Sequence, residues 1–194
     1  MLKNQLRPAV IVTVLLMLIT GILYPELVTA VSQLIFPRQA NGSLVVLNGR
    51  VIGSRLIGQQ FTRAEYFHGR PSAAGAGYDD TLSAGTNKGP TDRKLADTLI
   101  AAAVDSEVRL DGAVKGRIPA DLVTSSGSGL DPHISPGAAE LQVARVARAR
   151  RLDSTVVHAL VVRHTEGRQF GFFGEPRVNV LLLNLALDSL ARAP

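Results

Sequence analysis

No cysteine and no tryptophan occur among the 194 residues of the chain. The missing thiols exclude disulfides, thiolate metal sites and cysteine nucleophiles, and they suit an oxidising compartment, where stray thiols are a liability. Aromatic side chains are scarce as well, with six phenylalanines and three tyrosines. Because the net charge is only +5 and a base-stacking platform needs several aromatic side chains, we expect no nucleic-acid partner.

Charge is absent from one long stretch, residues 8–25. About 18 residues of α-helix at ~1.5 Å per residue measure ~27 Å, close to the ~30 Å hydrocarbon core of a bilayer. The apolar composition resumes at residues 27–36, so we expect the helix to continue beyond Pro25, which kinks it or ends its spanning part. The sequence therefore predicts a single transmembrane helix within residues 8–36.

Two other structures compete with a membrane span. A signal peptide would begin with Lys3 and Arg7 and be cleaved near residues 28–30, but the apolar run is too long for an ordinary one. A buried core helix seldom stays uncharged on every face over this length. We favour the retained span, and the positive-inside rule then places residues 1–7 in the cytoplasm and residues 37–194 outside it, as an extracytoplasmic domain.

The outer domain begins with β structure. Residues 37–42 have the composition of a linker, and Asn48-Gly49 then separates two segments, 43–47 and 50–57, that are rich in valine, isoleucine and leucine. Asn-Gly between apolar segments is the strongest short-range hairpin signal. We therefore predict a β-hairpin with one face in the hydrophobic core.

Periodic apolar positions predict several helices further along the chain. They are residues 91–104 (running on to about 110), 136–150, 153–164 and 178–190, with Thr91, Ser135, Asp153 and Asn179 as N-cap residues. A strand is the alternative for the first residues of the last helix. The arginines at 145, 148 and 151 are interpreted as a solvated helix face. The predicted fold class is α+β: one N-terminal transmembrane helix, then a mixed α/β extracytoplasmic domain with a β-hairpin and several helices.

A long loop is expected at residues 73–90, where glycine, alanine, serine and asparagine leave neither helical nor strand periodicity. Such loops often serve binding, and the alternative is an ordered loop held by the Asp79 and Asn87 side chains. Asp79-Asp80 lacks the spacing of an EF-hand, and residues 85–89 lack the order of a phosphate loop. We predict no metal site here.

Residues 119–136 concentrate serines, glycines and turn-forming residues more densely than any other stretch. One hypothesis is a membrane-tethered hydrolase in which Ser126 or Ser128 acts with Asp131 and His133. The other is a hydrogen-bonded loop that caps the following helix at Ser135. The G-x-S-x-G spacing of a nucleophile elbow is missing, and triad residues normally meet in space rather than in sequence. We favour the capping loop.

Five stretches together resemble a known family. They are Tyr66–Ala73, Gly89–Thr91, Pro119–Pro136, Gly174–Leu181 and Leu183–Asp188. In order and spacing, and in the single N-terminal span, they resemble the C subunit of the bacterial Kdp-type high-affinity potassium-transporting ATPase, over essentially the full length. The glycine- and alanine-rich residues 73–77 depart from the family pattern.

The resemblance implies an accessory, non-catalytic subunit that supports the assembly and stability of a potassium uptake pump in the bacterial inner membrane. Its partners would be a channel-like potassium-binding subunit, the ATP-hydrolysing P-type subunit and a small single-span subunit, besides the lipid bilayer. The resemblance also implies a catalytic chaperone that raises the ATP affinity of the hydrolysing subunit, and it is our one ground for considering ATP as a ligand. The predicted topology, in contrast, keeps the domain away from cytoplasmic ATP.

Neither a catalytic nor a metal-binding residue is predicted. A glycan-binding module of the cell envelope is a further alternative, for which exposed aromatic platforms would be expected. The residues expected to act in structure or at an interface are Tyr66, His68, Arg70, Ser126, Asp131, Pro132, His133, Ser135, Glu175, Arg177 and Asn179.

Overall fold

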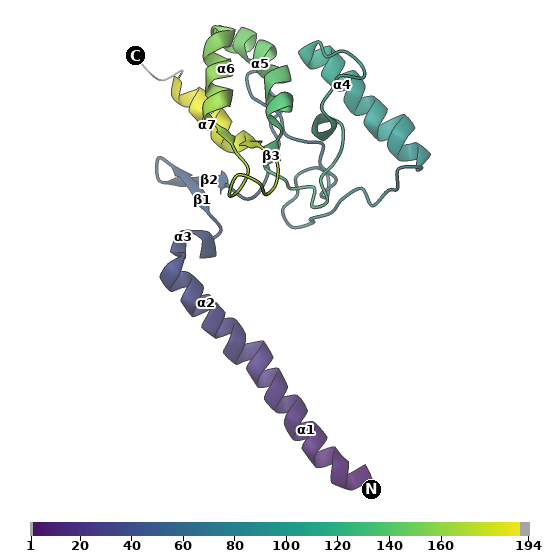
Figure 1. Ribbon diagram of the computed structural model, residues 1–194, viewed down its shortest axis with the longest axis vertical. Helices are drawn as coiled ribbons and strands as arrows, with labels where there is room; N and C mark the ends of the chain where they lie inside the picture. The colour runs from purple at the N-terminus through teal and green to yellow at the C-terminus, as the bar shows by residue number, and fades with distance from the viewer. Residues whose placement is uncertain (1, 191–194) are drawn as a thin grey trace. The chain divides into compact units, whose positions relative to one another are not determined.

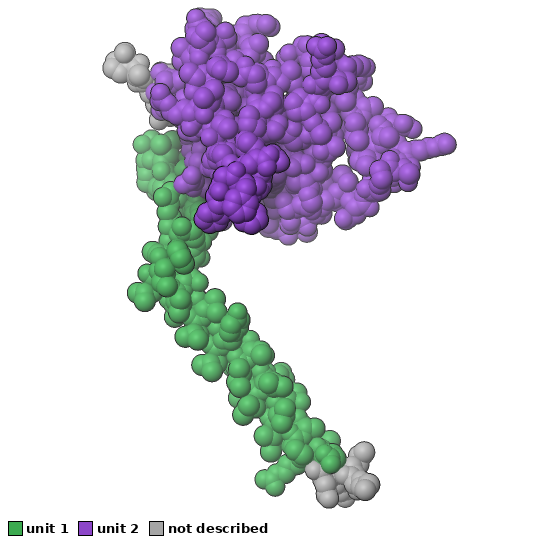
Figure 2. All heavy atoms as spheres, in the orientation of Figure 1, with its two compact units in different colours: residues 1–52 green, residues 53–194 purple. Residues whose placement is uncertain are grey.

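The structure, a computed structural model, describes residues 2–190, with side chains from Gln5 onward. It divides into two compact units, residues 1–52 and 53–194, which Figure 2 draws in green and purple. The first unit holds the apolar helix and most of the hairpin. The second holds the hydrophobic core.

The N-terminal helix runs without a break through α1 (Leu2–Leu18), a π-helical stretch η1 (Ile19–Leu23) and α2 (Tyr24–Ile35) (Figure 1). Pro25 does not end it. A proline gives no N–H and crowds the carbonyl four residues before it, and the wider π turn directly before Pro25 accommodates this misfit. Residues Gln5–Ile35 form one helix long and apolar enough to cross a membrane, and none of its most apolar window is buried within the structure.

The predicted linker at residues 37–42 was wrong in part, because α3 (Pro37–Ala40) is a short helical turn. Proline suits the first position of a helix. The Asn41 side chain closes the end of this turn by donating to the Pro37 carbonyl oxygen at 2.6 Å, and it also pairs with the Gln33 side-chain amide.

The hairpin consists of β1 (Leu44–Leu47) and β2 (Arg50–Ser54). Asn48 and Gly49 have φ of 51° and 76°, the two left-handed positions of a type I′ turn, so the predicted turn is confirmed. The predicted core face is not found among the described residues: Val46 and Val51 are each 59% exposed on one face, Val45 and Ile52 on the other are half-buried, and the core cluster includes no residue of either strand.

The second unit is built around a small antiparallel sheet with strand order β3-β5-β4, formed by β3 (His133–Ile134), β5 (Arg177–Asn179) and β4 (Thr165–Glu166). His133 is opposite Asn179, and Thr165 is opposite Val178. The central strand thus joins the loop at 119–136 to the C-terminal part of the chain.

The helices α5 (Pro136–Arg150), α6 (Ser154–Arg163) and α7 (Val180–Leu190) supply most of the core. Their predicted N-caps are confirmed: the side chains of Ser135, Asp153 and Asn179 accept from the backbone N–H of Ala138, Thr155 and Leu182. The strand that was the alternative for the start of the last helix is β5. Core residues shared by these helices include Val143, Val146, Val157, Leu160, Leu183 and Leu187.

One helix, η2 (Leu95–Ile100) continued by α4 (Ala101–Asp111), has no fully buried apolar residue. Its C-cap is Gly112 at φ 65°. Its N-terminal cap is Asp92, which accepts from the Leu95 N–H, so the choice of Thr91 was wrong. Its buried side chains include the carboxylates of Glu107 and Asp111. A 3₁₀ turn, η3 (Ala120–Leu122), then leads into the serine-rich loop.

Candidate functional site

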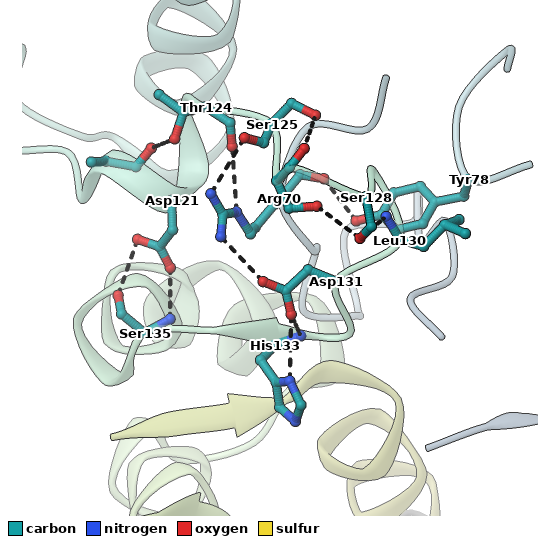
Figure 3. A network of polar contacts seen from close by, with 12 residues as sticks. Arg70, Tyr78, Asp121, Thr124, Ser125, Ser128, Leu130, Asp131, His133 and Ser135 are labelled. Atoms are coloured by element: carbon teal, nitrogen blue, oxygen red, sulfur yellow. Dashed lines mark hydrogen bonds and ion pairs between the residues drawn. The ribbon is translucent and has the colours of Figure 1, made fainter. Parts of the chain in front are cut away.

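The serine-rich loop is anchored by an arginine from a distant segment. The Arg70 guanidinium donates to the Asp131 carboxylate at 3.1 Å and, over longer distances of 3.4 and 3.5 Å, to the carbonyl oxygens of Thr124 and Ser125. Figure 3 shows the guanidinium between these three acceptors. Both side chains of the ion pair are about three-quarters buried, with 24% and 30% of their area exposed. Arg70 therefore ties two parts of the loop to the segment that carries Tyr66 and His68.

Asp131 is shared between Arg70 and His133. One carboxylate oxygen accepts from the His133 N–H at 3.0 Å and lies 3.4 Å from Nδ1 of the same histidine. Burial alone would raise the pKa of Asp131, but the hydrogen bonds from His133 and the charge of Arg70 outweigh it and hold the pKa below its ordinary value. Pro132 is buried, and its carbonyl accepts from the Val180 N–H at 3.0 Å. The Asp131 carboxylate thus fixes the turn that leads into β3.

Ser135 has one further hydrogen-bonding partner, Asp121, besides the helix that it caps. Its N–H and hydroxyl donate to the two carboxylate oxygens of Asp121, at 2.6 and 3.1 Å. Because Oγ also accepts from the Ala138 N–H, one serine links η3 to the start of α5. Ser135 is therefore the helix cap that the capping-loop hypothesis predicted.

Three backbone segments meet at Gly129. Its φ is +69°, and a Cβ there would lie 2.5 Å from the Ala84 carbonyl oxygen and 2.7 Å from the Ala74 nitrogen, so the close approach requires glycine. Ser72 Oγ donates to the Gly129 carbonyl at 2.7 Å and accepts from the Tyr78 N–H at 2.8 Å. The loop at 73–90 is therefore ordered by Ser72 and by this backbone contact.

The Asp79 side chain holds one turn of the 73–90 loop, as the ordered-loop alternative supposed, by accepting from the N–H and the hydroxyl of Thr81. Tyr78 ties the loop to the segment before it. It has φ of 56°, and its hydroxyl donates to the Arg70 carbonyl at 2.7 Å. Burial, followed by the charge of Asp131, raises the pKa of Tyr78 to about 12, which keeps this donor protonated at neutral pH.

The geometry does not support the hydrolase hypothesis. A triad histidine holds an aspartate with one ring nitrogen and the nucleophilic hydroxyl with the other. Ser128 Oγ instead accepts from the Leu130 N–H at 3.1 Å, and Ser126 Oγ lies 3.5 Å from Ser128 Oγ. Among the residues that the structure describes, no hydrogen bond joins either serine to His133.

A second cluster holds Tyr66 and His68, away from the serine-rich loop. The Asn184 side chain donates to and accepts from the Phe67 backbone at 3.0 and 2.8 Å, and Gln142 pairs with the His68 backbone in the same manner. The side-chain amides of Asn184 in α7 and Gln142 in α5 thus form, with the backbone of Phe67 and His68, the hydrogen bonds that a neighbouring strand would form in a sheet. Phe67 between them is fully buried.

The Tyr66 hydroxyl donates to Asp188 at 3.1 Å, and the Arg150 guanidinium covers the tyrosine ring at 4.8 Å while also pairing with Asp188 at 2.7 Å. Burial, followed by the charge of Arg145, lowers the pKa of His68 below its ordinary value. Burial thus favours the neutral form of His68.

Arg145 contradicts the predicted solvated face. Its side chain is 7% exposed and pairs at 2.7 Å with Asp111, which is 1% exposed, and it also donates to the carbonyls of Ala64 and Tyr66. Beside this pair, burial, followed by the charge of Asp111 and a hydrogen bond to it, raises the pKa of Glu107 to about 7. The solvated-face interpretation holds for Arg148 and Arg151, which are exposed.

Glu175, Arg177 and Asn179 lie in a third place, along β5 and before it. Glu175 pairs with Arg168 at the surface, at 2.6 Å, and Arg177 pairs with Glu166 across the sheet, at 3.0 Å. Asn179, besides capping α7, donates to the Arg55 carbonyl at 2.9 Å. The candidate residues therefore divide among three structural tasks and do not converge on one reactive centre.

Comparison with known proteins decides the family. The sequence profile described as KdpC: K+-transporting ATPase, c chain, matches residues 6–189. The chain belongs to this family. The resemblance inferred from the five stretches is confirmed. The match begins within the first turns of α1 and ends inside α7, so nearly all of the apolar helix, the serine-rich loop and the buried clusters lie within the extent of the family.

Relatives named Potassium-transporting ATPase KdpC subunit align over nearly their whole length. The protein of Gemmatimonas aurantiaca is 64% identical over 191 residues, which cover 98% of this chain and 95% of the relative. That of Methylococcus capsulatus is 56% identical over 188 residues, 96% and 98% of the two chains. That of Koribacter versatilis is 50% identical over 193 residues, 100% and 98% of the two chains.

Several residues that hold the domain together were not identified from the sequence. They are Arg145 and Asp111, the amides Gln142 and Asn184, and Tyr78. A signal for the amides was present, since Gln142 continues the stripe of Ala138 and Val146 on the buried face of α5, and Asn184 interrupts the leucines of α7. A polar residue on an apolar stripe implies a buried hydrogen-bonding partner.

Two open cavities adjoin these clusters. One, of about 480 Å³, is lined by Phe61, His68, Arg70, Tyr78 and Glu107 among others, and the second, of about 390 Å³, lies beside Tyr66 and Asp188. Across the described residues no group of three or more histidine, aspartate and glutamate side chains is placed to hold a metal ion. Three phenylalanines, 170, 172 and 173, are 89%, 65% and 57% exposed on one turn before β5.

Proposed function

We propose that the chain is the membrane-anchored accessory subunit of a potassium-transporting ATPase, with its domain outside the cytoplasm and with assembly of the complex as its task. The observation that carries this proposal is the family match, which takes in the apolar helix and the domain together. A subunit built this way presents two different surfaces to its partners. One lies in the bilayer and the other lies in water.

The orientation follows from charge. Lys3 and Arg7 precede the uncharged stretch 8–25, and no further basic residue occurs before Arg38. Under the positive-inside rule the short basic end stays in the cytoplasm. Residues 37–194 then lie on the outer side of the inner membrane, where the absence of thiols is an advantage.

A non-catalytic role is favoured because the candidate side chains are already engaged in hydrogen bonds and ion pairs within the domain. Asp131 is held by Arg70 and His133, and Ser135 is held by Asp121 and the helix it caps. Side chains engaged in this way keep loops in place, and a nucleophile or general base would need a free position facing a substrate. The loops so fixed are the parts of the domain best suited to a rigid docking surface.

The partners proposed are the channel-like potassium-binding subunit, the ATP-hydrolysing P-type subunit and a small single-span subunit. Contact with the channel-like subunit on the outer side is the physically simplest arrangement for a domain in this location. A higher ATP affinity of the hydrolysing subunit would then be an indirect effect, transmitted through the assembled complex, because the domain and cytoplasmic ATP lie on opposite sides of the membrane.

Purification of the affinity-tagged full chain from its own membranes in mild detergent tests the proposal. We expect the channel-like and P-type subunits to be recovered with it in fixed ratio, and potassium-stimulated ATP hydrolysis to follow the recovered complex. Recovery of the chain free of both subunits, under conditions in which they are present in the membrane, would refute the accessory role.

Topology is tested separately, since the chain lacks cysteine and one introduced thiol is a unique label. Thr81 and Ser189 are exposed in the domain, and Gln5 is exposed before the span. In intact spheroplasts a membrane-impermeant maleimide should label Thr81→Cys and Ser189→Cys, whereas Gln5→Cys should react only after lysis. The reverse pattern would place the domain in the cytoplasm.

A further inference from the structure

The helix formed by η2 and α4 contributes nothing to the hydrophobic core. Neither the buried cluster nor the partly buried residues packed against it include any residue from 95 to 111. Leu99 and Leu110 are exposed, and Figure 1 shows α4, in teal, at the edge of the domain. A helix in a protein is held mostly by the packing of its apolar face. The position of this helix therefore depends on its polar contacts.

A buried group of three charged side chains joins α4 to α5. Arg145 Nε donates to the Asp111 carboxylate at 2.7 Å, and Glu107, which is 9% exposed, forms a side-chain hydrogen bond with Asp111. Among the residues that the structure describes, the second oxygen of Glu107, Oε2, is buried without a hydrogen-bonding partner. One guanidinium thus serves two carboxyl groups and can balance the charge of only one.

The charge balance of this group depends on one proton. With Glu107 protonated, the two carboxyl groups share a hydrogen bond, and Asp111 and Arg145 form a neutral pair. With Glu107 ionised, that hydrogen bond is lost and one buried negative charge has no cation. Burial, followed by the charge of Asp111 and the hydrogen bond to it, accordingly raises the pKa of Glu107 to about 7.

The neighbouring elements do not supply the missing cation. Arg70 is paired with Asp131, and Lys115 is paired with Asp105 at the surface. Burial is the main cause that lowers the pKa of His68 and favours its neutral form. The remaining titratable groups on the adjoining elements are Tyr78 and Asp121, which add no positive charge, and the exposed Arg109, Arg117 and Arg148.

The helix also adjoins a cavity. The open space of about 480 Å³ is lined on one side by α4, from Ala102 to Leu110, and on the other mainly by residues 60–78. Atoms that face an empty space have no packing partners there, so little dispersion energy resists a movement of α4 away from the domain. Such a movement would open the cavity to the medium.

We propose that η2 and α4 form a pH-dependent cover of this cavity, closed while Glu107 and Asp111 share a proton and released when they lose it. The inference goes beyond the proposed function, which supplies only the location, outside the cytoplasm, where the pH follows the medium. Because the pKa of Glu107 is raised, the proton's stabilisation of the closed position is complete below pH 4.5 and is lost as pH rises through about 7. Alkaline medium therefore opens the cover.

A single thiol on α4 reports the opening, because the chain has no cysteine of its own. Ala103 lines the cavity and is half-buried, and Ser189 is an exposed reference. Maleimide labelling of Ala103→Cys and of Ser189→Cys is measured in the full chain, in detergent, from pH 5 to pH 8. The ratio of the two rates removes the effect of pH on the thiol. We expect this ratio to rise roughly ten-fold or more through pH 7.

Glu107→Gln identifies the group responsible. An amide has nearly the same size and donates to Asp111 without being able to lose a proton at these pH values, so the labelling ratio of Ala103→Cys should stay flat from pH 5 to pH 8. Asp97→Asn is the matched control, since Asp97 is an exposed carboxylate of the same helix, and it should leave the rise unchanged.

Hydrogen exchange distinguishes release of the cover from unfolding of the domain. At pH 8 we expect the opening constants of α4 amides to exceed those of α5 amides at least ten-fold. Glu107→Gln should slow the exchange of α4 at pH 8 roughly a hundred-fold, the order of factor supplied by a pKa raised from 4.5 to about 7.

The contrary results overturn the inference. A flat labelling ratio in the chain with Glu107 intact would show that the helix does not move with pH, and this measurement needs no change at Glu107. An equal rise in Glu107→Gln would assign the movement to another group. Equal opening of α4 and α5 would show that the domain unfolds as one unit. The proposed function is tested independently of these results, by recovery of the ATPase subunits with the chain.

Discussion

Arg145→Met is the substitution with the clearest expected effect on the domain. The guanidinium is buried and its partner Asp111 is more deeply buried still, at 1% exposed. Removal of the arginine leaves this carboxylate without its cation and leaves the carbonyls of Ala64 and Tyr66 without a donor. The damage thus reaches the segment that carries Tyr66 and His68.

Loss of one partner of a buried ion pair costs ~3–5 kcal/mol. For a domain of this size each kcal/mol shifts Tm by about 2–4 °C, so Arg145→Met should lower Tm by roughly 6–20 °C. The double variant Asp111→Leu with Arg145→Met removes both charges at once. It should regain most of that loss, because the penalty comes mainly from the unpaired charge and less from the missing contact.

Thermal unfolding of the full chain in detergent, followed by circular dichroism, measures these shifts. Arg148→Met is the control, because Arg148 lies on the same helix and is exposed, and it should change stability by no more than ~0.5 kcal/mol. If Arg145→Met behaves like the control, the guanidinium is solvated and the described ion pair does not hold the domain. A double variant less stable than the single one would refute the unpaired-charge explanation.

Further predictions concern single residues of the same domain. The pKa of Glu107 is raised from 4.5 to about 7, so its stabilising contribution is complete below pH 4.5 and is lost as pH rises through 7. Denaturant unfolding should therefore show Glu107→Gln more stable than wild type at pH 8, by a free energy of unfolding on the order of 3 kcal/mol. At pH 4 the two should differ little. Ser135→Ala should cost about 1 kcal/mol in the same assay, and an unchanged midpoint would contradict the cap. Gly129→Ala forces a Cβ into φ +69° and against backbone, so it should cost more than the ~1–2 kcal/mol of left-handed strain alone; a smaller loss would show that the three segments are not in close contact.

The parts of the fold predicted correctly are those determined by neighbouring residues. Asn48-Gly49 set the hairpin turn, and Ser135, Asp153 and Asn179 set the helix starts, because a turn or a cap depends on a few adjacent positions. The same holds for the apolar helix, where composition alone sufficed.

The misses depend on contacts between distant segments. Nothing near Arg145 in the sequence indicates Asp111, 34 positions away, and an arginine on a helix is ordinarily exposed. The hairpin was placed in the core because its residues are apolar, yet Val46 and Val51 are exposed. Apolar sequence predicts that a surface will be covered, but not whether this chain or a partner covers it.

The sequence identified residues of the candidate site but not the contacts between them. Arg70 and Asp131 were both named, and their ion pair was not, because it joins segments separated by 61 positions. Tyr66 and His68 were named through the family resemblance, while the amides that hold their backbone were not. Family motifs thus located the residues, and the physical role of each became clear only from its contacts.

ATP hydrolysis is the measurement that tests the accessory, non-catalytic role most directly. Potassium-stimulated hydrolysis is compared for the purified full chain, for the other ATPase subunits prepared without it, and for the two combined. We expect no hydrolysis by the chain alone, weak hydrolysis by the subunits lacking it, and recovery of full activity when they are combined. Hydrolysis by the isolated chain, or full activity of the other subunits without it, would contradict the role proposed here.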